Sequence, residues 1–408
     1  MPEIRPFPGV RYRVAGDELS RVLAPPYDVI PPSYQDELEA RDPRNVVRLI
    51  LNRSGNEAGY AEAGETYRRW LAEGVLAPDP EPALYLLEQS FRVDVRALRR
   101  YGLLARFRAE DLHQGGILPH EQTRSAPRED RYRLLRATRA NFSPIFLMFP
   151  DSGRFAARVA SVIDKPAALS CAADAGVRHR LWRVTEPATL AAFSTILALT
   201  RAYIADGHHR YATALRYRDE VGPEGAWTFG YFTPMGAPAL LVLPYHRILS
   251  QGPTLDEARR ALKGLFRLSD ASSVAAAAAA VARSTLPYAF ALAESGAGAL
   301  VAEALPEALD LVPADTPACL GVLDAFFVHR VVLPRLLSIP EDAVRYVHSL
   351  AEAEEAVRSR TCRLAMLMRP TPVRQIVDVA EARESMPAKS TFFHPKLPSG
   401  LVIHPLAV

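Results

Sequence analysis

Residues 201–220, RAYIADGHHRYATALRYRDE, place the residue types of a phosphate site between an apolar run and an amphipathic segment. We predict a short strand that ends at Asp206, a turn at Gly207 and a helix that begins at His208. The first N–H groups of a helix have no partner within it, and the helix dipole favours anions there. Glycine in the turn lets a ligand approach the backbone closely. The stretch is therefore typical of an anion-binding helix start.

The side chains around this turn favour the same chemistry. His208, His209 and Arg210 supply donors that phosphate oxygens can accept. Asp206 has three roles open to it, because it can cap the helix, hold Mg²⁺ or position a hydroxyl nucleophile. We interpret residues 206–210 as a phosphate cradle, with Asp206 as the candidate magnesium ligand.

Two other interpretations of this stretch stay open. Neighbouring helical residues point about 100° apart, so His208 and His209 cannot easily share one metal ion. The sequence holds neither HExxH nor HxxxH, and a third ligand from His113 or His120 would have to come from a distant part of the chain. The remaining interpretation is a structural turn with a capped helix.

A second polar group lies in residues 111–134, DLHQGGILPHEQTRSAPREDRYRL. His120 and Glu121 stand at the end of a loop that contains two glycines. A carboxylate beside a histidine could act as a general base or orient a substrate hydroxyl. The alternative is a solvated loop with salt bridges. Four further polar residues follow closely: Thr123, Arg124, Arg128 and Arg131.

The third group lies in residues 386–406, MPAKSTFFHPKLPSGLVIHPL, where two of the four lysines of this arginine-rich chain occur. Lys389, Ser390 and Thr391 end like a Walker loop, but the glycines that would precede them are missing. Together with Lys396 they could meet phosphate or carboxylate oxygens. The alternative is a proline-rich tail that packs its aromatic residues on the body of the protein.

The elements that must position these groups indicate a mixed α/β fold. Helical and strand patterns alternate through the first 250 residues, and the pattern changes near residue 250. We expect an α/β domain over 1–250 and a smaller α+β domain over 251–408, whose tail returns to the site. Two apolar runs, 21–32 and 45–51, are predicted to be strands. The segment 21–32 also holds Asp28, a candidate ligand for a metal or an amine.

Three pairs of neighbouring strands are also predicted: 82–93 with 99–112, joined by a tight turn, 227–235 with 239–249, and 288–294 with 298–305 as a hairpin. The helix after residue 185 is expected to start with Thr185 as its N-cap.

Composition excludes several classes of protein. The chain has 408 residues, 49% of them hydrophobic and 23% charged, and a net charge of +3 with both signs interspersed. This is not the charge distribution of a nucleic-acid-binding protein. Three scattered cysteines argue for a reducing compartment. No signal-peptide pattern and no long apolar run is present, so we expect a cytoplasmic protein without a membrane span.

Five motifs in order give the sequence a family resemblance: RPFPGVRY, LAPPYDVI, LPHEQT, ADGHHRYATAL and MPAKSTFFHPKLPSGLV. Together they resemble the bacterial and archaeal family known as domain of unknown function 1015. ADGHHRYATAL is also similar to the phosphate-binding strand–turn–helix of the ParB/sulfiredoxin superfamily, which includes free-serine kinases. The resemblance implies a ParB/sulfiredoxin-like core in the N-terminal part of the chain.

The same resemblance implies a chemistry, namely phosphoryl transfer from ATP or ADP, with Mg²⁺, to a hydroxy amino acid such as free L-serine, which gives O-phosphoserine. Glu121 would be the catalytic base and Asp206 would hold Mg²⁺ or orient the acceptor, while His120 would line the site. The other residues implied to bind phosphate, nucleotide or the substrate carboxylate are Gly207, His208, His209, Arg210, Lys389, Ser390, Thr391 and Lys396.

Other functions use the same residues. One is a nucleotide-binding regulator or sensor of ParB-like type, without turnover. Another is a phosphatase or phosphotransferase acting on phosphoserine. A metal-dependent hydrolase would need His113, His120, His208 or His209 to meet at one ion. The expected partners are a nucleotide and a small hydroxy amino acid, without nucleic acid or membrane, and a homodimer is compatible with the sequence.

Overall fold

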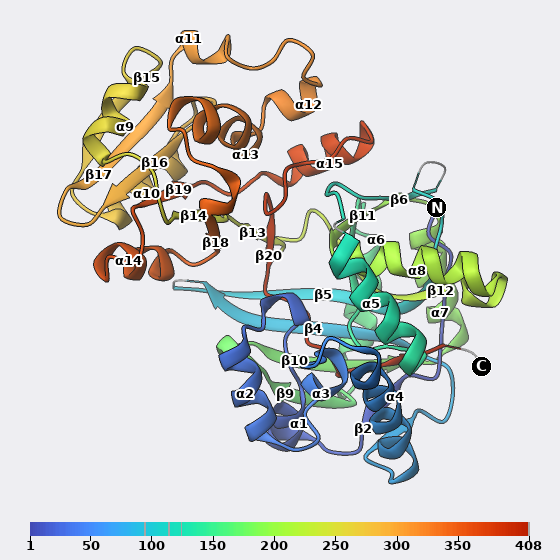
Figure 1. The fold of residues 1–408 in the computed structure, drawn as a ribbon. Helices are drawn as coiled ribbons and strands as arrows, with labels where there is room; N and C mark the ends of the chain where they lie inside the picture. Colours follow the sequence, from blue (N-terminus) through green and yellow to red (C-terminus); the bar gives the residue numbers. More distant parts are fainter. Residues whose placement is uncertain (94, 113–114, 124, 407–408) are drawn as a thin grey trace. The chain divides into compact units, whose positions relative to one another are not determined.

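The computed structural model describes residues 1–93, 95–112, 115–123 and 125–406 of the chain, which forms two compact units (Figure 1). The first unit comprises Met1–Pro119, Thr123–Leu241 and Pro395–Val408, and the second comprises His120–Gln122 and Val242–His394. The fold is mixed α/β, as predicted. Residue 250, near which we expect a boundary from the sequence, lies within the second unit, and the tail, which we expect to return to the site, belongs to the first unit.

A mixed sheet forms the centre of the first unit, with strands in the order β6-β11-β8-β12-β5-β4-β10-β9 and β1 paired to β5. β4 and β5 form the antiparallel pair that the sequence predicts, whereas β11–β6 and β12–β8 are parallel. The strands of this sheet are β1 (Ile4–Arg5), β4 (Leu84–Val93), β5 (Arg96–Arg108), β6 (Ile117–Leu118), β8 (Ile145–Phe149), β9 (Leu169–Ala172), β10 (Arg178–Val184), β11 (Ala202–Asp206) and β12 (Trp227–Pro234).

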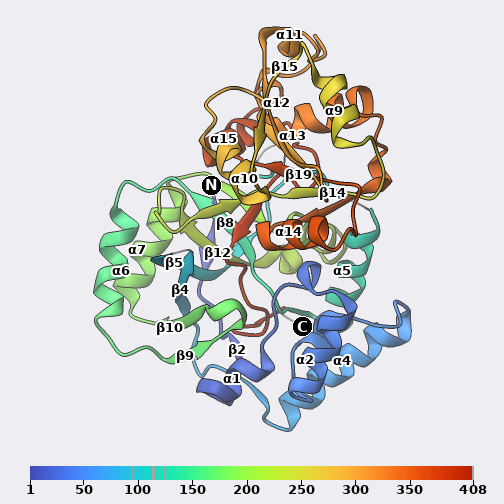
Figure 2. The same ribbon diagram turned by 90° about the vertical axis from the view of Figure 1, so that its left-hand side faces the viewer.

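Three helices cover one face of this sheet: α6 (Arg154–Ile163), α7 (Pro187–Ala198) and α8 (His208–Val221). Because successive strand residues point to opposite faces, Leu86, Leu103 and Leu147 meet Phe155 of α6 and Phe193 of α7 in one apolar core. Figure 2 shows α6 and α7 on one side of β4 and β5, with α2 and α4 on the other. α7 is capped by the Glu186 carboxylate, not by Thr185 as predicted.

The other face carries the N-terminal segments and the tail of the chain. The Phe7 and His404 rings lie 4.9 Å apart, and Val10 forms a bridge with Ile403. The elements of this part are α1 (Gly16–Val22), α2 (Pro32–Arg41), α3 (Val47–Ile50), α4 (Glu57–Ala72) and α5 (Ser125–Thr138), with the short strands β2 (Val10–Tyr12), β3 (Leu76–Pro78), β7 (Ala140–Asn141) and β21 (His404–Pro405) and the 3-10 turns η1 (Tyr27–Val29) and η2 (Asp174–Gly176). The 3-10 turn η3 (Pro223–Ala226) follows α8.

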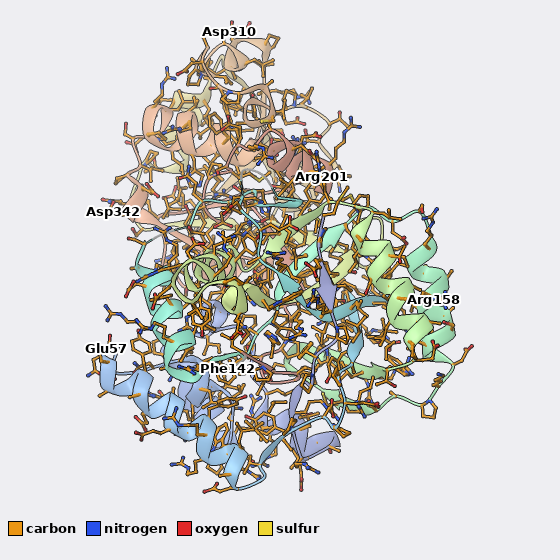
Figure 3. All side chains as sticks on the ribbon, turned by 90° about the vertical axis from the view of Figure 1, so that its right-hand side faces the viewer. Glu57, Phe142, Arg158, Arg201, Asp310 and Asp342 are labelled. Carbon is orange, nitrogen blue, oxygen red and sulfur yellow. The ribbon has the colours of Figure 1, made fainter. Side chains whose placement is uncertain are left out.

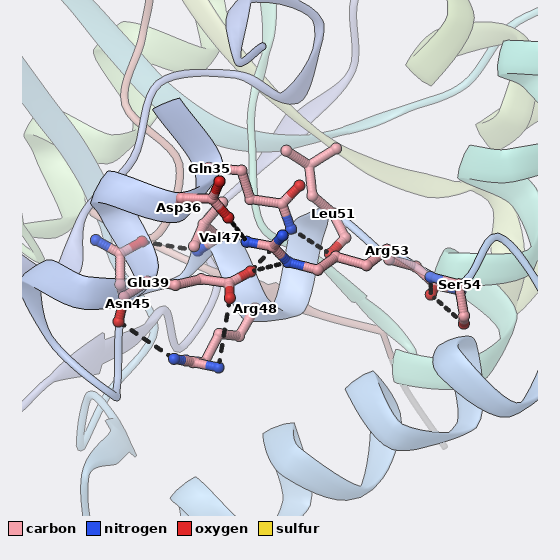
Figure 4. A network of polar contacts seen from close by, with 10 residues as sticks. Gln35, Asp36, Glu39, Asn45, Val47, Arg48, Leu51, Arg53 and Ser54 are labelled. Carbon is pink, nitrogen blue, oxygen red and sulfur yellow. Dashed lines mark hydrogen bonds and ion pairs between the residues drawn. The ribbon is translucent and has the colours of Figure 1, made fainter. Parts of the chain in front are cut away.

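The run at 45–51 is not the strand that its apolar residues predict, because it forms the short helix α3 (Figure 4). The Val47 N–H donates to Asn45 Oδ1 at 2.9 Å, and the Asn45 amide donates to the carbonyls of Arg21 and Leu23. Asn45 is fully buried, so its side chain satisfies backbone groups that a strand would have left for a ladder.

Two further strand predictions are wrong. Residues 21–32 contain the end of α1 and the turn η1, because their prolines remove N–H donors. The segments 227–235 and 239–249 do not pair with each other: β12 pairs with β5 and β8, while β13 (Leu241–Leu243) pairs with β20 (Phe392–His394). β14 (His246–Leu249) lies in the sheet of the second unit.

The second unit is built on an antiparallel sheet in the order β15-β17-β16-β19-β14-β18. β16 and β17 form the predicted hairpin. The strands not yet given are β15 (Phe266–Ala271), β16 (Phe290–Glu294), β17 (Gly298–Ala304), β18 (Val344–Val347) and β19 (Leu364–Met368). The helices are α9 (Leu255–Leu262), α10 (Val274–Arg283), α11 (Pro306–Leu309), α12 (Ala318–Gly321), α13 (Asp324–Phe327), α14 (Leu350–Arg358) and α15 (Val373–Glu381), with η5 (Glu341–Ala343).

This second sheet also has a core on each face. One core includes Leu249, Met366 and residues of α9 and α13, and the other includes Ile248 and residues of α10 and α14. The π-helix η4 (Val328–Leu336) continues α13 and contains Pro334, which cannot donate the usual helical hydrogen bond. Exposed positions carry charge, as at Asp310 and Asp342 (Figure 3). In the described residues, no helix has both the length and the apolar character needed to cross a membrane.

Replacing Asn45 tests this account. We expect Asn45→Ala to lower the free energy of unfolding by about 2–3 kcal/mol, because the Val47 N–H and two buried backbone carbonyls lose their partner. Urea unfolding followed by circular dichroism measures the change. Asn56→Ala is the control, since Asn56 caps α4 at an exposed position and should cost about 1 kcal/mol. Equal losses in the two variants would contradict the buried role of Asn45.

Candidate functional site

The turn between β11 and α8 adopts the geometry that the sequence predicts. Gly207 has φ 96° and ψ 29°, a left-handed conformation that favours glycine. The first helical hydrogen bond runs from the Tyr211 N–H to the Gly207 carbonyl, at 2.9 Å. A Cβ on Gly207 would lie 3.0 Å from the Arg210 guanidinium. Glycine therefore provides both the turn and the space in which Arg210 folds back over it.

The Asp206 carboxylate lies between two cations. Lys396 Nζ pairs with Oδ1, and Arg210 Nη2 pairs with Oδ2. The side chains of Asp206, Arg210 and Lys396 are 13%, 13% and 11% exposed. Burial alone would raise the pKa of Asp206, but the charges of Lys396 and Arg210 outweigh it and hold that pKa well below its usual range. The three side chains thus form a buried group with a net charge of +1 at the start of α8.

Two buried side chains of the sheet hold the tail that carries Lys396. Arg100 Nη2 donates to the Pro395 carbonyl at 2.6 Å and also to Gln89 Oε1. Gln89 Nε2 in turn donates to the Lys396 carbonyl at 3.1 Å. The Arg100 guanidinium lies 4.7 Å from the centroid of the Phe146 ring. Arg100 and Gln89 therefore fix the main chain from which Lys396 reaches Asp206.

A small cavity adjoins this group. Arg210 donates to the Pro144 carbonyl, and the Arg131 guanidinium lies 4.1 Å from the centroid of the Tyr27 ring. Burial, followed by the charge of Asp28, raises the pKa of Tyr27 to about 12, so its hydroxyl keeps its proton at neutral pH. The cavity has a volume of about 50 Å³ and is lined by Tyr27, Ile50, Arg131, Leu134, Leu135, Ala140, Asn141, Phe142, Ser143, Arg210 and Thr213.

A larger hollow of about 430 Å³ lies along α5 and α8, lined by Ser125, Ala126, Arg128, Glu129, Ala212, Thr213 and Arg216. Its volume is within the range of small-molecule pockets, about 300–1,000 Å³. Thr213 lines both spaces.

The carboxylate predicted to hold magnesium already has two cationic partners. Among them, no three histidine, cysteine, aspartate or glutamate side chains form a group that could hold an ion. Both oxygens of the predicted ligand Asp206 are engaged by cations. His208 is buried and its charge lowers the pKa of Asp206, while His209 is half-buried. The candidate residues therefore do not fit a resident magnesium ion.

Other predicted residues lie in the second unit and contact one another there. His120 Nε2 lies 3.1 Å from Thr391 Oγ1, and the His120 carbonyl accepts a hydrogen bond from the Met386 N–H at 2.8 Å. Glu121 forms a parallel bridge with Met386. His120 and Thr391 are both buried. These contacts join the short segment 120–122 to the segment that ends in β20.

The two residues before Thr391 have separate contacts. Lys389 has a positive φ of 59°, and its Nζ lies 5.4 Å from the centroid of the Tyr245 ring. Ser390 Oγ donates to the Pro387 carbonyl at 2.6 Å, and the Ser390 carbonyl accepts from Thr371 at 2.9 Å. The Ser390 hydroxyl thus stabilises a turn of the second unit.

The structure therefore divides the predicted site residues into two groups, one in each unit. Asp206, Gly207, His208, His209, Arg210 and Lys396 belong to the first unit, and His120, Glu121, Lys389, Ser390 and Thr391 belong to the second. His113 and Arg124 lie outside the described residues.

Sequence reasoning missed three residues beside the group in the first unit. Tyr27 adjoins Arg131 and the small cavity, whereas its neighbour Asp28, which the sequence suggested as a ligand, is exposed. The LAPPYDVI motif was the available signal for Tyr27. Arg100 and Gln89 carry no local signal, because they lie in ordinary strands and act on a distant tail.

The family of the chain follows from its sequence. A family model described as "Protein of unknown function (DUF1015)" matches residues 4–323. The chain belongs to this family. The matched residues include the RPFPGVRY, LPHEQT and ADGHHRYATAL motifs, which confirms the family that the five motifs indicate. No curated protein matches the chain.

Several solved structures are similar in part. A mutant free serine kinase in complex with AMP is 12% identical, with a TM-score of 0.35 over 68% of this chain and 84% of that one. A conserved hypothetical protein from Pyrococcus furiosus is 13% identical, with a TM-score of 0.34 over 70% and 90% of the two chains. SbnI from Staphylococcus aureus, truncated at its C-terminus, is 11% identical, with a TM-score of 0.35 over 71% and 84%. At these TM-scores the likeness does not bear on the function of this chain.

The Gly207 turn gives one prediction. We expect Gly207→Ala to destabilise the protein by about 1–3 kcal/mol and to displace Arg210, because alanine is strained at positive φ and its Cβ meets the guanidinium. Gly153→Ala is the matched control, since Gly153 precedes α6 at φ 92° and ψ −6°, also left-handed, with nothing within 4 Å of its Cβ position. Urea unfolding compares the two, and a smaller loss in Gly207→Ala than in Gly153→Ala would contradict the close approach.

The Asp206 pair gives a prediction on pH. The pKa of Asp206 is lower in the folded state than in the unfolded state. The ionised carboxylate therefore stabilises the fold at pH values above its usual pKa, near 4, and this stabilisation is lost as the pH falls below that value. Lys396→Met removes one of the cations that lower the pKa of Asp206, so the opposing effect of burial then raises this pKa. We expect acid unfolding to begin at a higher pH and stability at pH 7 to fall by about 3–5 kcal/mol.

Thermal unfolding between pH 3 and pH 7 measures both effects. Lys165→Met is the control, because Lys165 is exposed and should leave the pH profile unchanged. An unchanged acid limb in Lys396→Met would show that Lys396 does not govern Asp206.

Proposed function

We propose that this protein is a small-molecule kinase that transfers a phosphoryl group from ATP or ADP to a hydroxy amino acid, with free L-serine as the first candidate and O-phosphoserine as the product. The observation that carries the proposal is the buried group at the start of α8, where Lys396 and Arg210 flank Asp206 with a net charge of +1. The resemblance of ADGHHR to the motif of free-serine kinases supports the same assignment.

Phosphoryl transfer needs positioning and the neutralisation of charge more than covalent chemistry from the protein. A helix start offers N–H groups and a positive dipole end, and the Arg210 guanidinium, which lies over Gly207, adds charged donors beside them. Asp206 holds the Lys396 ammonium and the Arg210 guanidinium in place before a ligand arrives, so they need little reorganisation when charge develops on the phosphoryl oxygens. In this proposal Asp206 is a positioning residue.

Magnesium enters this proposal with the nucleotide, as part of the MgATP or MgADP substrate. Asp206 is engaged by two cations, so we assign it no metal-binding role. The 430 Å³ hollow along α5 and α8 has the size that a nucleoside needs. The 50 Å³ cavity beside Tyr27 and Arg210 suits a group of a few atoms, which favours a small acceptor.

The general base is assigned on different grounds. Glu121 stands in the LPHEQT motif, which resembles the glutamate motif of free-serine kinases, and it belongs to the second unit. We propose that its carboxylate takes the proton of the acceptor hydroxyl. His120, whose ring lies 3.1 Å from Thr391, positions the segment that carries Glu121.

A sensor of nucleotide without turnover is the second candidate. The low exposure of Lys396 and Arg210 and their pairing with Asp206 are equally suited to hold a phosphate that is never transferred. Product formation separates the two functions.

The test incubates the full-length protein with ATP or ADP, Mg²⁺ and L-serine or another hydroxy compound, and detects phosphorylated products by mass spectrometry. We expect O-phosphoserine from the wild type. Asp206→Asn and Lys396→Met should lower the rate about 10²–10³-fold, because an electrostatic contact to the phosphoryl group is lost or misplaced. Glu121→Gln should lower it about 10²–10⁴-fold while nucleotide binding persists.

Asp79→Asn is the matched control for Asp206→Asn. Asp79 is also a buried carboxylate, paired with Arg11 at 2.5 Å, and lies outside the proposed site. Its variant should keep the wild-type rate wherever it is folded. Nucleotide binding without product from any acceptor would favour the sensor, and the absence of nucleotide binding would refute both functions.

A further inference from the structure

A buried arginine in the second unit has no ion-pair partner among the described residues. Arg247, on β14, is 1% exposed. Its Nη1 donates to the Tyr245 carbonyl, whereas its Nε and Nη2 are buried and find no hydrogen-bond partner in the described part of the chain. Buried charged groups are almost always paired, since an unpaired one costs several kcal/mol. Arg247 is therefore an exception to the rule that buried charges are paired, and a bound ligand would explain it.

The unpaired atoms are the two donors on one edge of the guanidinium. This is the edge that other arginines of the protein use to bind carboxylates. Arg180 donates from Nε and Nη2 to the two oxygens of Glu88, at 2.9 and 2.6 Å. Arg369 donates from the same two atoms to Asp324, at 2.5 and 3.0 Å. Arg247 thus presents a complete two-pronged carboxylate edge without the carboxylate.

The strand register explains where this edge lies. Arg247 stands opposite Tyr346 of β18 and Met366 of β19, and its guanidinium carbon lies 5.7 Å from the centroid of the Tyr346 ring. Leu249 lies two residues after Arg247 on β14, so its side chain is on the same face of the sheet, where it belongs to an apolar core. The arginine is therefore placed at the margin of an apolar core, where its charge is poorly solvated.

A cluster of aromatic side chains lies on the Tyr346 side of the guanidinium. The rings of His329 and Tyr346 are stacked, with centroids 6.0 Å apart, and Tyr346 Oη lies 3.3 Å from His329 Nε2. The Tyr245 ring meets Tyr346 edge-on at 6.2 Å. His329 is carried by the π-helix η4, a distortion that often occurs at functional sites. Tyr346 and His329 are only half-buried, so the cluster extends to solvent.

The charges around Arg247 leave it uncompensated. Burial, followed by the charge of Arg247, lowers the pKa of His246 to about 4 and that of His329 to about 3, so both are neutral at pH 7. Burial lowers the pKa of Arg247 itself to about 10, which still leaves it charged. The nearby charge of Asp324 opposes that shift, but the Asp324 carboxylate is bound by Arg369. One unit of positive charge remains to be balanced.

We propose that Arg247, with Tyr245, His329 and Tyr346 around it, forms a binding site for the carboxylate group of a small organic acid, the class that includes the amino acids. A carboxylate carries the single negative charge that balances Arg247, and its two oxygens match the Nε and Nη2 donors. The aromatic rings would contact the apolar part of the ligand. Inorganic phosphate, with nearly two negative charges, fits this balance less well.

The proposal goes beyond the kinase function and does not depend on it, because the group around Asp206 belongs to the first unit. The test titrates the full-length protein with acetate and with L-serine, each labelled with ¹³C at the carboxylate, and separately with inorganic phosphate, and follows ¹³C or ³¹P line broadening. We expect saturable binding of a carboxylate probe, weakened at least tenfold in Arg247→Met. Binding that persists unchanged in Arg247→Met would overturn the proposal, as would the absence of saturable carboxylate binding in the wild type.

Three controls make this test specific. Arg345→Met should bind like the wild type, since Arg345 is exposed and its cross-strand partner is Ile248, whose side chain is on the other face of the sheet. Asp206→Asn should also keep the Arg247-dependent binding, which separates this site from the kinase site. Saturable binding of phosphate but of neither carboxylate would overturn the assignment of ligand class.

A melting curve distinguishes binding from a structural role. We expect Arg247→Met without ligand to melt at or above the wild-type temperature, because methionine removes an unpaired buried charge. A strong fall in melting temperature would overturn the view that Arg247 serves a ligand. Arg247→Lys keeps the charge but lacks the two-pronged edge, so we expect it to fold and to bind carboxylate at least tenfold more weakly. Undiminished binding by folded Arg247→Lys would refute the role of that edge.

Discussion

The burial of one carboxylate between two cations is the constraint on which the candidate site depends. Lys396 and Arg210 lie against Asp206 and hold it as an anion, and each of them is brought there by a different part of the first unit. Gly207 gives Arg210 the space to fold back over the turn, and Arg100 and Gln89 fix the tail that carries Lys396. The two ion pairs of Asp206 thus depend on three separate parts of the first unit. These are the Gly207 turn, the buried side chains of Arg100 and Gln89, and the segment that carries Lys396.

The sequence predicts those parts of the structure that local rules decide. The β11–turn–α8 unit follows from an apolar run, a glycine and an amphipathic segment, and the β4–β5 pair follows from two neighbouring runs. The run at 45–51 became a helix because Asn45 satisfies backbone groups that are distant in sequence, which no periodicity reveals. Arg100 and Gln89 could not be predicted for the same reason, since their partners lie about three hundred residues further along the chain.

The two units treat buried arginine differently. In the first unit, the donors of Arg100 reach a main-chain carbonyl and a glutamine, and Arg210 reaches a carboxylate and a carbonyl. In the second, Arg247 meets one carbonyl and aromatic rings but no carboxylate among the described residues. An uncompensated buried charge destabilises a folded protein, and for this reason we assign Arg247, in contrast to Arg100 and Arg210, to a ligand.

The position of Lys396 in the chain has a consequence for synthesis. Asp206 and Lys396 are 190 residues apart, and most of the second unit is encoded between them. A ribosome therefore completes the second unit before the tail of the first unit can close over Asp206. Until then Asp206 can pair with Arg210 but not with Lys396. A nascent or truncated chain without Lys396 would leave the start of α8 more exposed. The site can therefore be assembled only after the second unit has been synthesised.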